Sequence, residues 1–464
     1  MAEQKLFVGL AVRRLRRTSG KTQAAMAEAL GISASYLNLV ERNQRPLTAT
    51  LLLRLADLFD FDPRQLAANE PGGGVDALRR RLGDPIFADL GIDRARLDDW
   101  LGAAPEAAEA FARAYDRMAA TGAIDDDEPI APVRREIARW RNHFADLDHA
   151  AEALADDLRA GSGDLYGAIA DRLRVTHQLS IRILPVDVMP ATLRRLDLHA
   201  RQVQLSELLD PASRTFAAAF QLAQLEAREA IEALVKGAGF TAMDHGRASE
   251  RLYRRHLTSS FAAGLMMPYG RFLRACEATG YDVELLQRRF GAGFEQVAHR
   301  LTTLSRVGAR GLPFFMLRID RAGQASKRYA GASAAPLIDA DARCPLWDVH
   351  AAFARPGSLV RQLVETEDGS RWFTIARTVS PQGTRIGQVR AQFAIGLGVD
   401  AAFAPSLAAA RGFDLKLGAA TPVGLGCRAC TRADCPQRSA PPASRPLIFN
   451  ERERGVSPFV FSGE

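Results

Sequence analysis

Apolar residues in the first part of the chain recur at three- and four-residue spacing, the period of an amphipathic helix. Within residues 22–46, Thr22 is placed to cap one helix, Gly31 to turn the chain, and Ser33 to cap a second helix. Two short helices joined by a glycine turn are typical of a helix-turn-helix unit. The pattern therefore predicts a small all-α domain at the N-terminus.

The pattern changes several times further along the chain. Residues 69–75, NEPGGGV, break any helix and predict a linker, and residues 76–158 return to helical spacing. Residues 179–209 alternate in a way that favours a small sheet, and two long helices are expected over residues 212–236 and 246–265. After residue 313 the chain is strand-rich, with a hairpin that turns at Asp368-Gly369.

Composition indicates a folded protein of several domains, since the 464 residues are 47% hydrophobic and 25% charged. No apolar run reaches the roughly 18 residues of a membrane span, and the first residues lack the features of a secretory signal. We therefore expect a cytoplasmic bacterial protein with no membrane partner. The net charge of +7 favours a polyanionic partner, but the excess is mostly arginine in an Ala/Arg-rich composition, so charge adds little.

Residues 22–46 resemble the lambda-repressor-like, xenobiotic-response-element (XRE) class of DNA-binding domains, including the Thr-Gln opening and the Val-Glu-Arg-Asn that follows the second helix. The resemblance implies double-stranded operator DNA as partner, a homodimer on two half-sites, and a second helix in the major groove. Asn38 is the best candidate for base reading, because an amide can bond two edges of one base. A protein-docking role for the unit, and a packing role for Tyr36, remain alternatives. The expected DNA contacts are Gln23, Ser33, Ser35, Tyr36, Asn38, Arg42, Asn43 and Arg45.

The middle of the chain resembles the ImmA/IrrE-like metallopeptidases, most closely in the string FAAGLMMP at residues 261–268. Active members carry H-E-x-x-H on one helix, where two histidines hold zinc and the glutamate is a general base. The corresponding stretch here is residues 220–224, FQLAQ, and the expected carboxylate of the next helix is Leu257. We therefore expect no enzyme activity, and a hollow that binds a small effector instead.

One regulator family combines these features, the short-chain fatty acyl transcriptional regulators, which join an XRE domain to a degenerate peptidase-like domain and a cysteine-bearing C-terminal domain. The resemblance extends over nearly the whole chain and includes MMPYGRFLRACEATGYD and GCRACTRADCPQR. It implies control of propionate, acetate, methylcitrate or glyoxylate genes, with an acyl-CoA as effector. Candidate effector contacts are Tyr269, Arg271 and Arg274, a ring and two guanidinium groups suited to adenine and phosphates. Packing of Tyr269 and solvent exposure of the arginines are the alternatives.

Three cysteines near the C-terminus, Cys427, Cys430 and Cys435, form a C-x2-C-x4-C motif that lacks one ligand for a four-coordinate site. Cys344 is the expected fourth ligand, because Cys344-Pro345 mirrors Cys435-Pro436, whereas Cys276 lies in a helical stretch and is expected to be buried. Four thiolates suit a four-iron, four-sulfur (4Fe-4S) cluster or Zn²⁺. The one-knuckle pattern and the family resemblance favour the cluster, with zinc or free thiols as alternatives.

Together these observations predict a multidomain transcriptional regulator of short-chain acyl-CoA metabolism. Its expected fold is an all-α helix-turn-helix N-terminal domain, an α+β zincin-like middle domain and an α+β C-terminal domain. A regulator whose cluster is the main redox or iron input is one alternative, and a metallopeptidase acting on a repressor is a disfavoured second. The expected segments are residues 1–68, the DNA-binding domain; 69–75, the linker; 76–160, a helical connecting region; 161–312, the degenerate peptidase-like domain; and 313–464, the ligand- and metal-binding domain.

Overall fold

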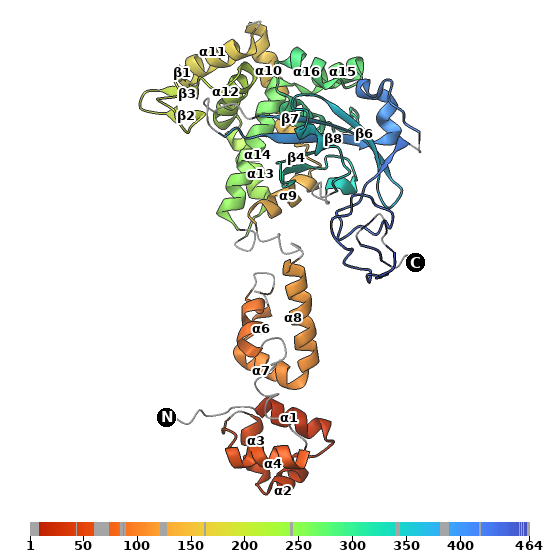
Figure 1. Cartoon of the computed structure of the whole chain (residues 1–464). Helices are drawn as coiled ribbons and strands as arrows, with labels where there is room; N and C mark the ends of the chain where they lie inside the picture. Colours follow the sequence, from red (N-terminus) through yellow and green to blue (C-terminus); the bar gives the residue numbers. More distant parts are fainter. Residues whose placement is uncertain are drawn as a thin grey trace. The chain divides into compact units, whose positions relative to one another are not determined.

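The chain forms two compact units, residues 1–128 and 129–464, each of which is described by itself (Figure 1). The coordinates are a computed structural model. They describe residues 9–42, 44–59, 74–83, 87, 90–120, 128–161, 164–241, 245–338, 344–380, 389–416, 419–453, 455, 457 and 459–461.

The first four helices of unit 1 make the expected helix-turn-helix, and their caps are the ones that the sequence predicts. Thr22 accepts a hydrogen bond from the backbone N–H of Ala25, Gly31 is left-handed with φ 66°, and Ser33 accepts from the N–H of Tyr36. The apolar core of these helices includes the fully buried Leu37. The helices are α1 (Gly9–Thr18), α2 (Gln23–Leu30), α3 (Ala34–Glu41) and α4 (Ala49–Phe59).

Three further helices complete unit 1 around a separate small core, which includes Leu78, Leu97 and Leu101. They are α6 (Gly74–Leu82), α7 (Arg94–Ala103) and α8 (Pro105–Ala120). The start of α6 differs from the predicted linker of residues 69–75, because Gly74 and Val75 already belong to the helix. The rest of that predicted linker lies outside the described residues.

Unit 2 begins with helices and a three-stranded mixed sheet of order β1-β3-β2. The predicted helix over residues 212–236 is in fact two helices, because the backbone leaves helical geometry at Ala227. The elements are α9 (Ile130–Arg139), α10 (Ala145–Gly161), α11 (Leu165–His177), β1 (Ser180–Leu184), β2 (Arg194–Asp197), β3 (Gln202–Ser206), α12 (Pro211–Glu226), α13 (Arg228–Ala238), α14 (Arg247–Met266), α15 (Tyr269–Thr279), α16 (Val283–Phe290) and α17 (Phe294–Leu301).

The second part of unit 2 is built on a six-stranded sheet of order β5-β4-β8-β7-β6-β9, in which only the β6–β9 pair is parallel. The predicted hairpin is confirmed as β6 and β7, whose turn contains Gly369 at φ 81°. The strands are β4 (Phe315–Ile319), β5 (Ala325–Tyr329), β6 (Val360–Glu365), β7 (Arg371–Val379), β8 (Phe393–Asp400) and β9 (Thr421–Pro422). Short 3-10 turns lie at Pro336–Ile338, Ala351–Phe353, Ala401–Ser406 and Ala408–Ala410.

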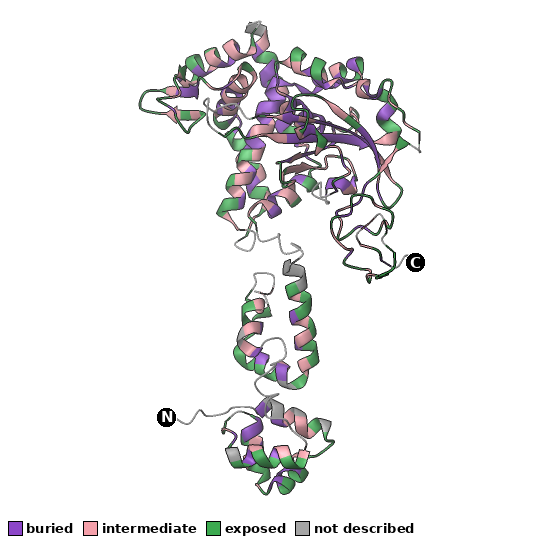
Figure 2. Cartoon of the chain, in the orientation of Figure 1, coloured by how far each residue is buried: buried purple, intermediate pink, exposed green. Residues whose placement is uncertain are grey.

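The two faces of the six-stranded sheet belong to different cores, and both faces are buried (Figure 2). Met316 and Leu397 pack with the helices, whereas Phe315 and Trp347 pack on the opposite side. The helices of residues 130–301 and the sheet therefore share one hydrophobic core, which crosses the expected boundary at residue 312. The structure confirms the multidomain fold class, with a helical N-terminus followed by α+β regions. No helix in the described part of the chain is long and apolar enough to cross a membrane.

Candidate DNA interface, effector region and metal centre

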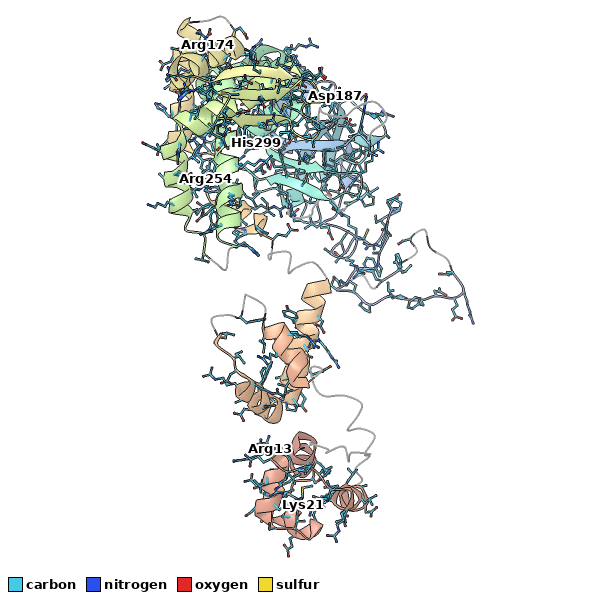
Figure 3. All side chains as sticks on the ribbon, turned by 90° about the vertical axis from the view of Figure 1, so that its left-hand side faces the viewer. Arg13, Lys21, Arg174, Asp187, Arg254 and His299 are labelled. Atoms are coloured by element: carbon cyan, nitrogen blue, oxygen red, sulfur yellow. The ribbon has the colours of Figure 1, made fainter. Side chains whose placement is uncertain are left out.

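Most of the polar residues expected to touch DNA lie on α3, at its N-cap and on the turn that follows it, whereas Gln23 begins α2. Ser35, Arg42 and Arg45 are exposed, and Tyr36 and Asn38 are half-buried. The hydroxyl of Ser33 caps α3 through a 3.1 Å bond from the Tyr36 N–H. Asn43 lies outside the described residues. In Figure 3, Arg13 and Lys21 add further positive charge to the same small unit. The structure thus groups the described candidates, and their contacts with DNA remain a prediction.

A partly buried polar network connects α1, α2 and α3. The amide nitrogen of Gln23 donates to Asn38 Oδ1 at 3.3 Å and to Glu41 Oε2 at 3.0 Å. Arg16 donates two hydrogen bonds of 2.6 and 3.0 Å to the same carboxylate, and the Glu41 side chain is only 3% exposed. The hydrogen bond to Glu41 raises the pKa of Arg16. The network fixes Asn38, the expected base reader, relative to α2.

Sequence reasoning missed the role of Arg16. The signal was present in Glu41, which lies one helical turn beyond the buried Leu37 and so shares its inward face. A carboxylate in that position needs a cationic partner from another element.

The stretches that resemble the peptidase motif lie on α12 and α14, and none of the three expected ligand positions carries a zinc-binding side chain. Phe220 and Gln224 occupy the expected histidine positions, and Gln221, which replaces the glutamate, is 1% exposed. Leu257, which replaces the carboxylate ligand, is fully buried. The guanidinium of Arg194 on β2 reaches this place instead, hydrogen-bonds both glutamine side chains, and lies 4.6 Å from the centre of the Phe220 ring.

Glu226 is half-buried at the end of α12. Arg172 and His177 each contact its carboxylate at 2.9 Å. Burial alone would raise the pKa of Glu226, but these two partners lower it. The carboxylate is therefore committed to contacts with α11.

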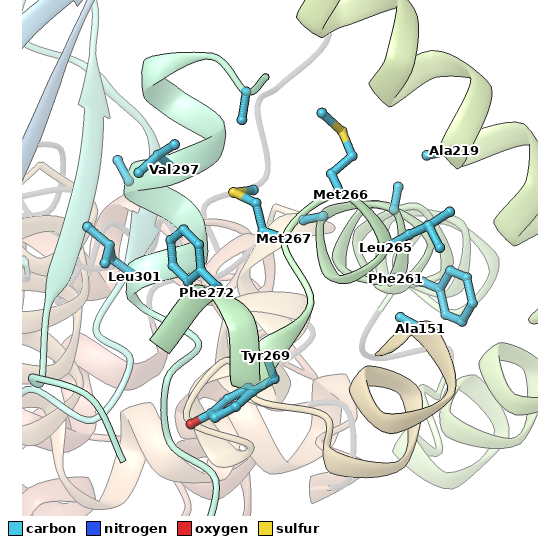
Figure 4. Close-up of a cluster of buried hydrophobic side chains, with 14 of the residues drawn as sticks. Ala151, Ala219, Phe261, Leu265, Met266, Met267, Tyr269, Phe272, Val297 and Leu301 are labelled. Carbon is cyan, nitrogen blue, oxygen red and sulfur yellow. The ribbon is translucent and has the colours of Figure 1, made fainter. Parts of the chain in front are cut away.

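Tyr269 is part of the buried interior, among the side chains drawn in Figure 4. Its hydroxyl donates to the Ala309 carbonyl at 2.7 Å and accepts from the Arg306 N–H at 2.9 Å. The Arg306 guanidinium lies 4.0 Å from the ring centre. Burial raises the pKa of Tyr269. These contacts match the packing alternative for this residue.

Arg271 and Arg274, the other two expected effector contacts, are exposed on α15. Arg271 pairs with Asp156 at 3.1 Å. The structure does not bring these arginines together with the Tyr269 ring in one pocket, and an effector role for the three remains a prediction. A small polar pocket does lie beside Tyr269, whose ring centre is 5.5 Å from that of His143. It is lined by Asn142, His143, Phe144, Leu147, Asp148, Ser260, Arg300 and Thr303.

All four expected metal ligands line a single pocket at the C-terminal end of unit 2, although Cys344 precedes the others by more than eighty residues. Three of the thiol sulfurs accept N–H donors: Cys344 from Gly424 at 3.4 Å, Cys427 from Ser439 at 3.4 Å, and Cys430 from Arg438 at 3.8 Å. The fifth cysteine, Cys276, is fully buried in the helical core, as expected. The pocket is lined by Cys344, Pro345, Pro422, Gly424, Gly426, Cys427, Cys430, Arg432, Cys435 and Arg438.

Arg438 organises this loop from within. Its guanidinium donates to the carbonyls of Cys427, Cys430 and Arg432, it is 4% exposed, and no described carboxylate pairs with it. Its Nε is buried without a hydrogen-bond partner. A buried cation of this kind is stabilised by negative charge nearby, which thiolates would supply.

The four thiols are not close enough together to coordinate one metal ion. Among the residues that the structure describes, no three His, Cys, Asp or Glu side chains stand close enough together to hold a metal ion. Burial raises the pKa of Cys430, and the Arg432 N–H and Arg438 act in the opposite direction. Metal binding would need these thiols to lose their protons and to draw together.

Comparisons with known proteins agree with this organisation. Three family models match consecutive parts of the chain: a helix-turn-helix domain at residues 8–68, an IrrE N-terminal-like domain at 176–302, and the C-terminal domain of short-chain fatty acyl coenzyme A regulators at 303–459.

Similar proteins include the HTH-type transcriptional regulator RamB of Mycobacterium tuberculosis, 36% identical over 98% of this chain and 99% of that protein. A propionyl-CoA carboxylase regulator of Cereibacter sphaeroides is also 36% identical, with the same coverage. A solved Mycobacterium tuberculosis transcriptional regulator is 34% identical and superposes with a TM-score of 0.67, covering 72% of this chain and 99% of the other.

The helix-turn-helix unit and these full-length relatives define a transcriptional regulator. More specifically, the chain belongs to the family of short-chain fatty acyl coenzyme A regulators.

Proposed function

We propose that this chain regulates genes of short-chain acyl-CoA metabolism by binding operator DNA as a homodimer, and that an acyl-CoA is its effector. The observation that carries the proposal is the combination of a capped helix-turn-helix with a C-terminal domain of the short-chain fatty acyl coenzyme A regulators. A full-length relative that regulates propionyl-CoA carboxylase supports the class of metabolite.

The effector proposal is tested on the full chain, purified without oxygen, with DNA selected by the protein from a randomised pool. Propionyl-CoA is expected to change the dissociation constant for that DNA, and free coenzyme A is the control ligand. The Asn38→Ala variant should bind the selected DNA about tenfold or more weakly, because it removes the proposed base contact. A DNA affinity that does not change at saturating acyl-CoA contradicts the effector proposal. Sedimentation of the same sample tests the homodimer.

We also propose a 4Fe-4S cluster on Cys344, Cys427, Cys430 and Cys435, which share one pocket with N–H donors and the buried Arg438 cation. Iron and sulfide analysis of the anaerobic protein is expected to give a stoichiometric cluster, and each Cys→Ser change at these positions should lower it. Cys276→Ser is the matched control and should keep it. A colourless protein with stoichiometric zinc contradicts the cluster assignment.

The same sulfur–arginine arrangement favours a second candidate function, in which the cluster itself is the redox or iron input. DNA binding is then expected to follow cluster oxidation or loss with acyl-CoA absent. An acyl-CoA response that persists in a cluster-free variant would assign the input to the effector.

A further inference from the structure

The structure places an arginine against the three residues that stand at the expected H-E-x-x-H positions. Arg194 leaves the edge strand β2 and lies against α12, at the positions that carry H-E-x-x-H in active enzymes. Its Nη1 donates to Gln221 and to Gln224, the latter at 3.1 Å, and the guanidinium lies over the Phe220 ring at 4.6 Å. Three replacements of the catalytic motif thus hold one fixed cation.

Both glutamine contacts use the same nitrogen of Arg194, so the other edge of the guanidinium remains free. No described residue accepts a hydrogen bond from its Nε or Nη2, and neither is among the buried nitrogens without a partner. These two atoms therefore have access to solvent. They form the edge with which arginine binds carboxylates and phosphates through two parallel hydrogen bonds.

The electrostatic surroundings favour an anion at this edge. Burial, and then repulsion from Arg255 on α14, lower the pKa of Arg194. Neither arginine pairs with a carboxylate among the described residues, whereas the buried Arg300 pairs with Asp148 at 2.7 Å. A partly desolvated cation with a second cation nearby is stabilised by a bound anion.

We propose that Arg194, assisted by Arg255, binds an oxyanion, either a phosphate or a carboxylate group, beside the residues at the expected H-E-x-x-H positions. The bidentate edge of Arg194 holds two of the oxygens, and Gln221, Gln224 and Phe220 keep that edge in place. This oxyanion site does not depend on the proposal that an acyl-CoA is the effector. Either proposal can therefore fail without the other.

The test measures the unfolding temperature of the full chain against increasing phosphate or propionate, with chloride at equal ionic strength as the reference. A saturable rise above chloride is expected for the native protein, because a ligand that binds only the folded state stabilises it. A rise in unfolding temperature with phosphate indicates a phosphate site, and a rise with propionate indicates a carboxylate site. No saturable rise with either anion in the native protein overturns the proposal.

Two variants and a matched control locate the site. Arg194→Met should weaken the apparent anion affinity about tenfold to hundredfold, the value of a charge-assisted hydrogen-bond pair. Arg195→Gln is the control, since that neighbouring side chain lies on the opposite face of β2 and bonds Gln204 at 2.7 Å. Arg255→Gln keeps all the contacts of Arg194 and should weaken binding less. Equal anion affinity in Arg194→Met and Arg195→Gln overturns the assignment. If Arg194→Met does not fold, Arg255→Gln takes its place, and an unchanged anion affinity in that variant overturns the assignment.

Discussion

Single residues decide whether the DNA-binding unit is held in shape, and Arg16 is the clearest case. It is the only described cation bonded to the buried carboxylate of Glu41. Replacement by Met would leave that charge uncompensated, at a cost of about 3 kcal/mol. We expect Arg16→Met to lower the free energy of opening of α2 and α3 by that amount, as measured by hydrogen exchange. Arg17→Met, at an exposed position of the same helix, should leave the exchange of α2 and α3 unchanged. Equal exchange in the two variants would contradict a stabilising role for the ion pair.

Two half-buried histidines, His256 and His299, should make unit 2 sensitive to acid. Burial lowers the pKa of His256 to about 3 and that of His299 well below its usual value. Both stay neutral in the folded chain, whereas the unfolded chain protonates them near pH 6.5. The unfolded state therefore binds more protons below pH 6.5, and stability falls by about 1.4 kcal/mol per pH unit for each histidine down to the folded pKa.

The measurement is the urea unfolding of unit 2 between pH 7 and pH 5. The double variant His256→Gln, His299→Gln should have a smaller slope of unfolding free energy against pH than the native chain. His149→Gln, at an exposed position, is the control. Figure 3 labels His299, which lies on α17 of this unit. A double variant with the native slope would show that the acid sensitivity comes from other groups.

At the scale of elements, the cysteine loop depends on a close approach to a glycine. A Cβ added at Gly424 would lie 2.5 Å from the Cys430 sulfur and 2.7 Å from its Cβ, closer than packing allows. We expect Gly424→Ala to displace the Cys430 segment and to increase the rate at which that buried thiol is alkylated. Gly455→Ala is the control, because its nearest atoms would be at ordinary distances of 3.7 and 3.8 Å. An unchanged alkylation rate in Gly424→Ala would contradict the packing of this loop.

Elements with local signals were predictable from the sequence, and long-range pairings were not. Thr22, Gly31 and Ser33 carry cap and turn chemistry that acts within three or four residues, so the helix-turn-helix could be placed. The β6–β7 hairpin follows in the same way from its turn. The order β5-β4-β8-β7-β6-β9 has no such signal, because it depends on packing between distant segments.

The candidate site divides in the same way. The Cys-Pro pair that Cys344 shares with Cys435 led to the prediction that Cys344 joins the C-terminal triplet. In the structure the four cysteines line one pocket. Arg194 was not identified, since nothing near it in the sequence indicates that β2 lies beside residues 220–224. The contact of Arg194 with these residues becomes visible only once the sheet is folded onto α12.

At the scale of the whole molecule, residues 1–128 and 129–464 have separate hydrophobic cores. We therefore expect the two units to unfold in separate calorimetric transitions, since units with separate cores need not unfold together. Arg16→Met should lower only the transition of the first unit, on the order of 10 °C. Phe272→Ala should lower only the other, because that side chain is fully buried in the core drawn in Figure 4.

The double variant Arg16→Met, Phe272→Ala tests whether the two units unfold independently. If the units are independent, its two shifts equal those of the single variants, because sites with no shared partners add. A single transition that either substitution moves would contradict independence and would show that the two units unfold as one. In that case a ligand bound in unit 2 would stabilise the DNA-binding unit directly, since the free energy of binding would be part of one common transition.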